Sequence, residues 1–203
     1  MNKISLGITN NFCPQTLFIY GTYKEDGTPD FGLFCWFSYV WNDGLGVMAC
    51  IGGDKMTKDN IRRNKMFSAN LVNEQLLPMA DYFGNVQGYN EAKMKKLPEI
   101  IKGSVLDVPV LADSPVSYEL EVVEEINLAG SDVFICKIRN VMGDEYLGDK
   151  ETTLQERMRR VQPVFTTHQT YFQSTATQMG GWGEELKKLG DEYDKEGVQL
   201  AGD

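Results

Sequence analysis

Histidine and paired cysteines are scarce in this sequence. The 203-residue chain has a single histidine, His168, and its four cysteines include no Cys-x-x-Cys pair. The commonest general base and the usual zinc-ligand spacing are therefore missing, and we expect neither a catalytic side chain nor a metal site. Any chemistry is then expected to come from a bound cofactor. The cysteines are predicted to be free thiols packed as small hydrophobic residues, at positions 13, 35, 50 and 136.

The chain also lacks a basic excess and a long apolar run. Twenty lysines and arginines face 29 acidic residues, a net charge of −9, which disfavours a nucleic-acid partner. No apolar stretch is long enough to span a bilayer, and the first residues lack the apolar segment of a signal peptide. We therefore expect a cytoplasmic protein with no membrane partner.

The order of the predicted elements indicates a mainly β fold. No repeat or linker divides the chain, so we expect one domain over residues 1–203, with an acidic C-terminal helix and tail at about 181–203. Strands are predicted at 17–23, 33–40, 45–51, 66–71, 116–122, 133–141 and 163–172. Helices are predicted at 57–64, 75–83, 90–96, 150–160 and 182–197. Because the strands are joined by hairpins without a βαβ rhythm, a closed or half-closed antiparallel, Greek-key-like β-barrel with peripheral helices is favoured.

A glycine turn before a helix is the first candidate binding site. Residues 51–60 read IGGDKMTKDN, in which the two glycines let a ligand approach the backbone closely. The first amides of a helix are free donors and attract an anion, and Lys55, Thr57 and Asn60 could add a charge and further donors. The alternative is an ordinary strand-to-helix turn with Thr57 or Asp54 as the N-cap.

Other segments offer weaker candidates. Trp36, Phe37 and Ser38 could wall in a planar heterocycle, although an alternating strand buries at least one of the two aromatic residues in the core. Asp81 to Gly84 could equally be a helix end. His168 is interpreted as structural or exposed. Four glutamates, at positions 119, 121, 124 and 125, are interpreted as the solvated face of a strand.

Taken in order, these segments resemble the flavin reductase-like, FMN-binding split-barrel family, above all its flavoredoxin-like branch. The likeness covers roughly residues 15–175 and rests on the order of several short blocks. The matching residues are Trp36-Phe37-Ser38, then Thr57, Asn60 and Ile61, then Phe67, Asn70 and Leu71, then Asp81, Tyr82, Gly84, Gly88 and Lys93, and last the long hairpin at 108–141.

The resemblance implies a homodimeric split barrel that holds FMN near the dimer interface. The phosphate is expected on Lys55, Thr57 and Asn60, and the isoalloxazine ring along Trp36, Phe37 and Ser38 and near Cys50 and Ile51. The implied activity is that of an NAD(P)H:flavin reductase-like oxidoreductase. Hydride would pass from NADH or NADPH to FMN and on to an acceptor, with no catalytic side chain.

One departure from the family pattern leaves alternatives open. Many members carry Gly-(Asp/Glu)-His after the long hairpin, whereas this chain has Gly143, Asp144 and Glu145. The nicotinamide donor is therefore in question, and the alternative is a non-enzymatic FMN electron carrier that docks to a redox protein. A third possibility is a barrel that binds haem or pyridoxal phosphate, although haem would have no evident axial ligand beyond His168.

Overall fold

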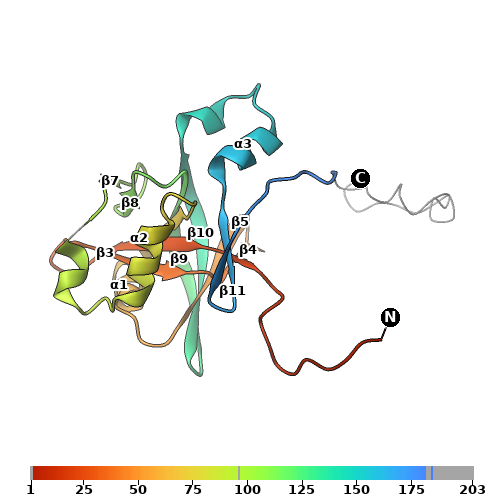
Figure 1. Ribbon diagram of the computed structural model, residues 1–203. Coiled ribbons are helices and arrows are strands. Elements are labelled where there is room, and N and C mark those ends of the chain that lie inside the picture. The colour runs from red at the N-terminus through yellow and green to blue at the C-terminus, as the bar shows by residue number, and fades with distance from the viewer. Residues whose placement is uncertain (1, 96, 182–183, 185–203) are drawn as a thin grey trace.

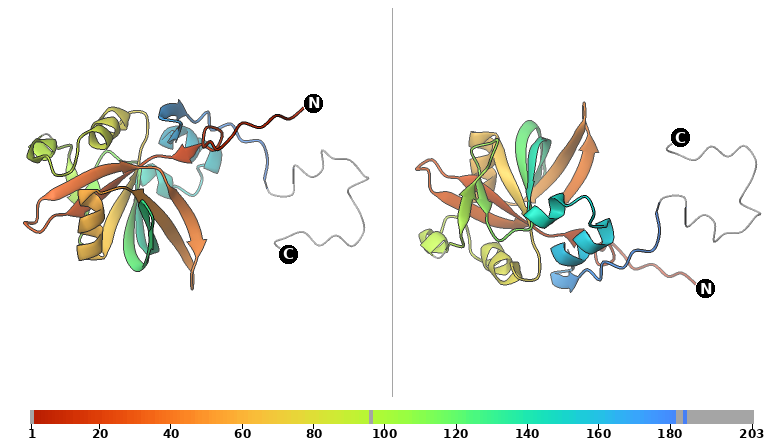
Figure 2. Two further views of the ribbon diagram at one scale, coloured as in Figure 1. Left: turned by 90° about the horizontal axis from the view of Figure 1, so that it is seen from below. Right: turned by 90° about the horizontal axis from the view of Figure 1, so that it is seen from above.

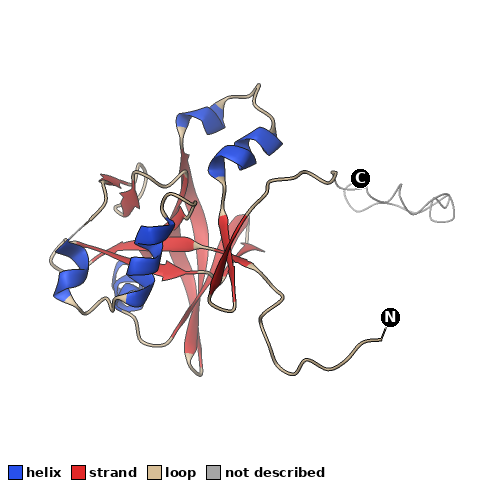
Figure 3. Ribbon diagram, viewed as in Figure 1, coloured by secondary structure: helices blue, strands red, loops and turns tan. Residues whose placement is uncertain are grey.

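A computed structural model describes residues 2–95, 97–181 and 184 of the chain (Figure 1). Its strands are β1 (Gln15–Thr16), β2 (Phe18–Tyr23), β3 (Pro29–Phe34), β4 (Phe37–Trp41), β5 (Leu45–Gly52), β6 (Met66–Leu71), β7 (Ile100–Lys102), β8 (Pro109–Leu111), β9 (Val116–Leu128), β10 (Ser131–Gly143), β11 (Val164–Thr167) and β12 (Thr170–Gln173). Its helices are α1 (Met56–Asn64), α2 (Leu77–Asn85) and α3 (Leu154–Val161), with 3₁₀ turns η1 (Glu91–Lys95) and η2 (Glu145–Gly148) (Figure 3).

The main sheet is antiparallel, and its two edge strands, β3 and β4, are consecutive in the chain. Its strand order is β3-β2-β6-β9-β10-β5-β4. The predicted single strand at 33–40 is wrong, because β3 ends at Phe34 on one edge and β4 begins at Phe37 on the other. Cys35 and Trp36 cross the gap between the edges. The predicted mainly β, split-barrel fold is confirmed, and this gap is the split.

The sheet encloses one hydrophobic core and has a second core outside it. Side chains on a strand alternate between faces, and β2 places Phe18 and Tyr20 inside the barrel, while Ile19 and the preceding Leu17 pack on the outer side. Helix α1 contributes Ile61 to the inner core, and α2 contributes Phe83 to the outer one. The two helices therefore lie on opposite sides of the β2–β3 pair (Figure 2).

Elements with strong local signals form where the sequence predicts them. Strand β6 has the predicted bounds. Helix α1 begins one residue before the predicted helix and ends at the predicted residue, and Lys65 follows as its C-cap with a left-handed φ of 56°.

Helix α3 begins four residues later than predicted, at a capping box in which Thr153 and Glu156 satisfy each other's backbone amides. The predicted helix at 90–96 is only the 3₁₀ turn η1.

The predicted strand at 163–172 is a hairpin. His168 and Gln169, with φ angles of 47° and 61°, form its two-residue turn between β11 and β12. Two successive positive φ angles match the twist of the flanking strands, and such turns usually carry Asn or Gly, which is why this sequence hides the turn. The predicted C-terminal helix at 182–197 falls, apart from Glu184, outside the described residues.

The interpretation of Glu119 as solvated is wrong. Its carboxylate, on β9, is fully buried and accepts hydrogen bonds from the backbone amides of Ser104, Val105 and Leu106 and from the Asn140 side chain. Burial alone raises the pKa of a carboxyl group, but these hydrogen bonds lower the pKa of Glu119 below its usual value. The strand face predicted to meet solvent is covered here by a loop.

Candidate functional site

A cavity of about 900 Å³ opens at the split of the barrel. Its walls are the chain crossing from β3 to β4, the middle of β5, the end of α2, the segment before β2 and the β11–β12 hairpin. This volume lies in the range of small-molecule and cofactor sites. Among the described residues, the hairpin is tied to α2 by the Tyr171 hydroxyl, which donates to the Asp81 carboxylate at 2.6 Å.

Most residues predicted to contact a planar ring line this cavity. Trp36, Phe37, Ser38 and Cys50 all lie in its wall. The Trp36 side chain is half exposed, and the Phe37 ring is stacked on Phe18 with centroids 4.2 Å apart. The Trp36 carbonyl accepts the Cys50 amide, which fixes the crossing segment against β5. The crossing segment therefore places two aromatic side chains, Trp36 and Phe37, in the cavity wall.

Ile51 is placed differently from its neighbours. Its side chain is fully buried in the barrel core, packed with residues of the inner sheet face. It does not line the cavity. Contact between Ile51 and a ligand stays a prediction.

A small cavity of about 30 Å³ adjoins the large one, and the two share Leu33, Phe34 and Gly84 as walls. Lys55 and Thr57, predicted as phosphate ligands, line it together with Lys93. We call Lys55, Thr57 and Lys93 the basic corner. It combines two ammonium groups with the first turn of α1, where helix amides favour an anion.

Asn60, the third predicted phosphate ligand, has other partners. Its amide group donates to the Thr22 hydroxyl at 3.1 Å, and its oxygen accepts from the Arg63 guanidinium at 2.9 Å. The side chain is buried and attaches α1 to β2. A contact between Asn60 and a ligand stays a prediction.

Asp30 is a site residue that sequence reasoning missed, and Lys93 was matched to the family pattern without a predicted role in binding. Lys93 is 2% exposed, no described carboxylate lies within ion-pair distance of its ammonium, and that group lies 5.9 Å from the centre of the Phe83 ring. Asp30 is fully buried, and its Oδ2 accepts the Thr57 hydroxyl at 2.9 Å. Burial lowers the pKa of Lys93 and raises the pKa of Asp30. Asp30 follows a Gly-Thr-Pro turn, so its sequence context suggested only a loop.

The cysteines and the histidine also gather at the large cavity. Cys13, Cys35 and Cys50 line it. The prediction that the thiols pack as small hydrophobic residues holds for Cys136, which is buried in the inner core, and for Cys35, which packs partly buried against the outer core, but not for the exposed Cys13. All four are free, as predicted. His168 lines the cavity from the hairpin turn.

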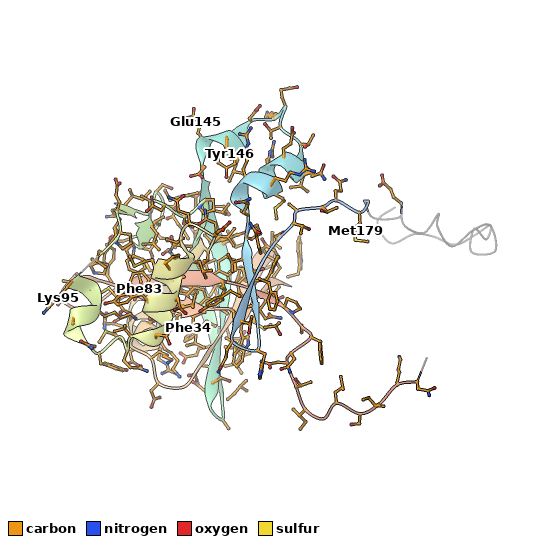
Figure 4. The ribbon with its side chains drawn as sticks, viewed as in Figure 1. Phe34, Phe83, Lys95, Glu145, Tyr146 and Met179 are labelled. Atoms are coloured by element: carbon orange, nitrogen blue, oxygen red, sulfur yellow. The ribbon has the colours of Figure 1, made fainter. Side chains whose placement is uncertain are left out.

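The residue at the position of the family's histidine lies elsewhere. Glu145 begins η2, near α3 and away from Phe34 and Phe83 (Figure 4). It is exposed and does not line either cavity. Within the described ranges, no cluster of three or more His, Cys, Asp or Glu side chains is arranged to hold a metal ion. No described helix is both long and apolar enough to cross a membrane.

An antiparallel barrel that is open between two edge strands, with a cavity at the opening, defines a split-barrel protein. A family model described as "Flavin reductase like domain" matches residues 10–163. The chain therefore belongs to the flavin reductase-like family, which supports a flavin-binding, oxidoreductase-type function.

Solved structures of similar fold agree with this assignment. The flavoredoxin of Methanosarcina acetivorans superposes with a TM-score of 0.81 at 20% identity, covering 93% of this chain and 100% of that one. The flavoredoxin of Desulfovibrio vulgaris (Miyazaki F) gives 0.81 at 22% identity, with 91% and 100% covered. An FMN-binding protein from Thermus thermophilus gives 0.72 at 17% identity, with 89% and 98% covered. At these identities the likeness shows the fold.

Proposed function

We propose that this protein is an FMN-dependent oxidoreductase that takes electrons from NADH or NADPH and delivers them to an acceptor. The observation that carries this proposal is the pairing of two cavities: a large one walled by aromatic side chains, and the basic corner beside it. FMN has the same two parts, a flat ring and a phosphate. Bound FMN would supply the redox chemistry, and the chain would supply position and charge.

The residues of the site fit FMN. The two lysines and the start of α1 favour a phosphate group, since charge-assisted hydrogen bonds to phosphate are the stronger kind. Gly32 keeps the corner open, because a Cβ at that position would lie 2.9 Å from the Thr57 hydroxyl oxygen. Trp36 and Phe37 supply the wall for the ring.

A second function, that of an FMN electron carrier without reductase activity, is favoured by one observation. Glu145 replaces the histidine that many members of the family place near the nicotinamide, and it lies outside both cavities. A carrier would exchange electrons with a redox protein instead of a nicotinamide. The two functions differ in whether NADH or NADPH reduces the bound flavin.

We also propose that the protein acts as a homodimer. Large apolar side chains are exposed around β4 and β5, namely Trp36, Tyr39, Trp41, Leu45 and Met48. Tyr39, Trp41 and Leu45 share one face of the β4–β5 pair, and exposed apolar side chains gathered in this way mark interaction sites. A second copy covering it would lie next to the cavity. Trp41→Ser with Leu45→Ser is expected to shift the protein to a monomer in light scattering, and an unchanged mass would contradict this interface.

Anaerobic reduction tests the reductase proposal. Purified protein with FMN is mixed with NADH and separately with NADPH, and the flavin absorbance at about 450 nm is followed. Bleaching with either nicotinamide supports the reductase. Flavin that stays oxidised with both, yet is reduced by dithionite, supports the carrier. An absorption spectrum with haem or pyridoxal bands would contradict both.

Removing two residues of the basic corner tests where the phosphate binds. The double variant Lys55→Ala/Thr57→Ala is expected to weaken FMN binding by about 1–3 kcal/mol, through loss of charge-assisted hydrogen bonds. The control is Lys102→Ala/Thr152→Ala, which removes the same residue types from exposed or partly exposed positions that line neither cavity. Equal affinity of the two double variants would mean that the phosphate binds elsewhere.

A further inference from the structure

A buried acid lies directly behind the basic corner, where its negative charge would disfavour a bound anion. Asp30 has no solvent exposure, and its Oδ2 is engaged with the Thr57 hydroxyl. Its Oδ1 is buried and has no hydrogen-bond partner among the described residues. Buried polar atoms are nearly always satisfied, so an orphaned carboxylate oxygen here needs an explanation.

The hydroxyl of Thr57 cannot serve Asp30 and a phosphate at the same time. A threonine hydroxyl has one hydrogen to donate and two lone pairs, whereas an ionised carboxylate only accepts. While Asp30 is ionised, Thr57 must give its hydrogen to Asp30 Oδ2 across the 2.9 Å contact. Only the lone pairs of the Thr57 hydroxyl oxygen then face the basic corner. Phosphate oxygens are also acceptors, so this arrangement opposes phosphate binding.

Protonation of Asp30 removes the conflict. A protonated carboxyl group donates, so the hydrogen bond can reverse and Asp30 can donate to the Thr57 oxygen. The Thr57 hydrogen is then free to point toward an anion between Lys55 and Lys93. Loss of the negative charge on Asp30 also removes its repulsion of that anion.

We propose that Asp30 is a positioning residue that takes up one proton when the phosphate of FMN enters the basic corner, and so turns the Thr57 hydroxyl into a phosphate donor. This inference rests on the proposed function, because it requires FMN in the cavity. Asp30 touches Thr57, not the flavin ring, and takes no part in electron transfer. The proton comes from solvent and returns to solvent when FMN leaves.

The surroundings of Asp30 agree with this role. Burial has the largest effect on its pKa and raises it, while Lys93 on η1, the Thr57 hydrogen bond and Lys24 just after β2 lower it. Tyr89 also faces this region, but its hydroxyl donates to Asp59 at 2.7 Å. The pKa of Asp30 is raised overall, and a bound phosphate dianion would raise it further.

Counting protons on binding tests the proposal directly. FMN is titrated calorimetrically into the full-length protein in buffers of different ionisation enthalpy, and the number of protons taken up is obtained from the slope. Wild type is expected to take up as much as one proton more than Asp30→Asn. The amide group of that variant is neutral at every pH and can donate to Thr57 permanently. The phosphate of free FMN titrates identically in both measurements, so the difference arises from Asp30 and its coupling to the bound phosphate.

The pH dependence of the affinity for FMN gives a second test, because proton uptake is linked to binding. Above the pKa of Asp30, the FMN dissociation constant of wild type is expected to rise by up to about tenfold per pH unit relative to Asp30→Asn. Riboflavin has the same ring without the phosphate, and its affinity is expected to show no such difference. Thr57→Val keeps the shape of the side chain without the hydroxyl, and it is expected to lose the extra proton as well.

The outcomes distinguish a failure of the inference about Asp30 from a failure of the proposed function. If FMN binds but wild type, Asp30→Asn and Thr57→Val all take up the same number of protons, the inference is overturned and the proposed function stands. If neither FMN nor riboflavin binds to wild type, the proposed function fails and the inference fails with it. If Asp30→Asn does not fold, as judged by circular dichroism, the comparison of wild type with Thr57→Val decides.

Discussion

Replacing Glu119 by glutamine should destabilise the protein although the change is nearly isosteric. The carboxylate accepts five hydrogen bonds: to Oε1 from the Ser104 amide and hydroxyl and from Asn140, at 3.0, 2.9 and 2.8 Å, and to Oε2 from the amides of Val105 and Leu106, at 2.9 and 2.6 Å. An amide group has a single acceptor oxygen. In either orientation, the glutamine side chain of Glu119→Gln would turn an NH₂ group toward donors.

The expected loss of unfolding free energy follows from the donors that lose their acceptor. With the glutamine oxygen placed at Oε1, two backbone N–H groups face the amide nitrogen, and each unsatisfied donor costs about 1–3 kcal/mol. The loop at 104–106 is partly exposed and can admit water, so we expect a total near the lower end, about 2–4 kcal/mol. For a chain of this length that corresponds to a fall in Tm of roughly 5–15 °C.

Urea unfolding followed by tryptophan fluorescence measures this loss. The control is Glu121→Gln, two residues away, which removes only an exposed ion pair with Arg139 and should cost below about 1 kcal/mol. The pKa of Glu119 is lower in the folded state than in the unfolded chain, so its stabilisation is complete above about pH 4.3 and is lost as pH falls through the folded pKa. The difference between wild type and Glu119→Gln should therefore shrink in acid. Equal losses for the two variants at neutral pH, or a difference between wild type and Glu119→Gln that persists unchanged at about pH 3, would refute the reasoning.

Three further substitutions test other parts of the structure. Gly32→Ala would press a methyl group against the Phe34 ring and the Thr57 hydroxyl oxygen, and it should weaken FMN binding in a fluorescence titration while riboflavin binding changes less; equal loss for both flavins would contradict this. Lys58→Ala removes the shorter of the two ion pairs of Asp132, at 2.6 Å, and leaves the one with Arg62 at 2.9 Å, so urea unfolding should show a loss of about 1–3 kcal/mol, below that of a fully unpaired buried carboxylate. A loss below about 1 kcal/mol would mean that Arg62 alone compensates the charge of Asp132. Thr153→Ala removes the cap of α3 and should cost about 1 kcal/mol in thermal unfolding, whereas no change would show that the helix frays there in wild type.

Local patterns predicted those parts of the fold whose cause is local. Helix α1 and strand β6 form where the sequence places them, because a helix start and a short apolar run depend on residues close in the chain. The strand 33–40 was predicted as continuous because its apolar run has no Gly or Pro to mark a break. The break at Cys35 and Trp36 arises because the two halves pair with strands at opposite edges of the sheet.

The residues of the candidate site also divide into some whose proximity is local in the sequence and others that only packing brings together. Lys55 and Thr57 stand two residues apart at a helix start, so their proximity is visible in the sequence, and the structure places both at one small cavity. Asp30 and Lys93 join them from distant segments. Asp30 carries no local signal, and Lys93 was matched to the family pattern without any sign that it lies beside Lys55. Burial, which shifts the pKa of both groups, is a property of the packed molecule.

The sequence by itself determined that the protein is a mainly β chain with a flavin reductase-like order of motifs, because strand alternation, turns and helix starts are local properties. Only the tertiary structure decided which acid is solvated and which is buried. It enclosed Glu119 under a loop and set Asp30 behind the basic corner. It also turned residues 163–172 into a hairpin that brings His168 to the cavity. The physical reason is that burial and unsatisfied hydrogen bonds are created when segments distant in the sequence pack together, and no pattern within one segment records them.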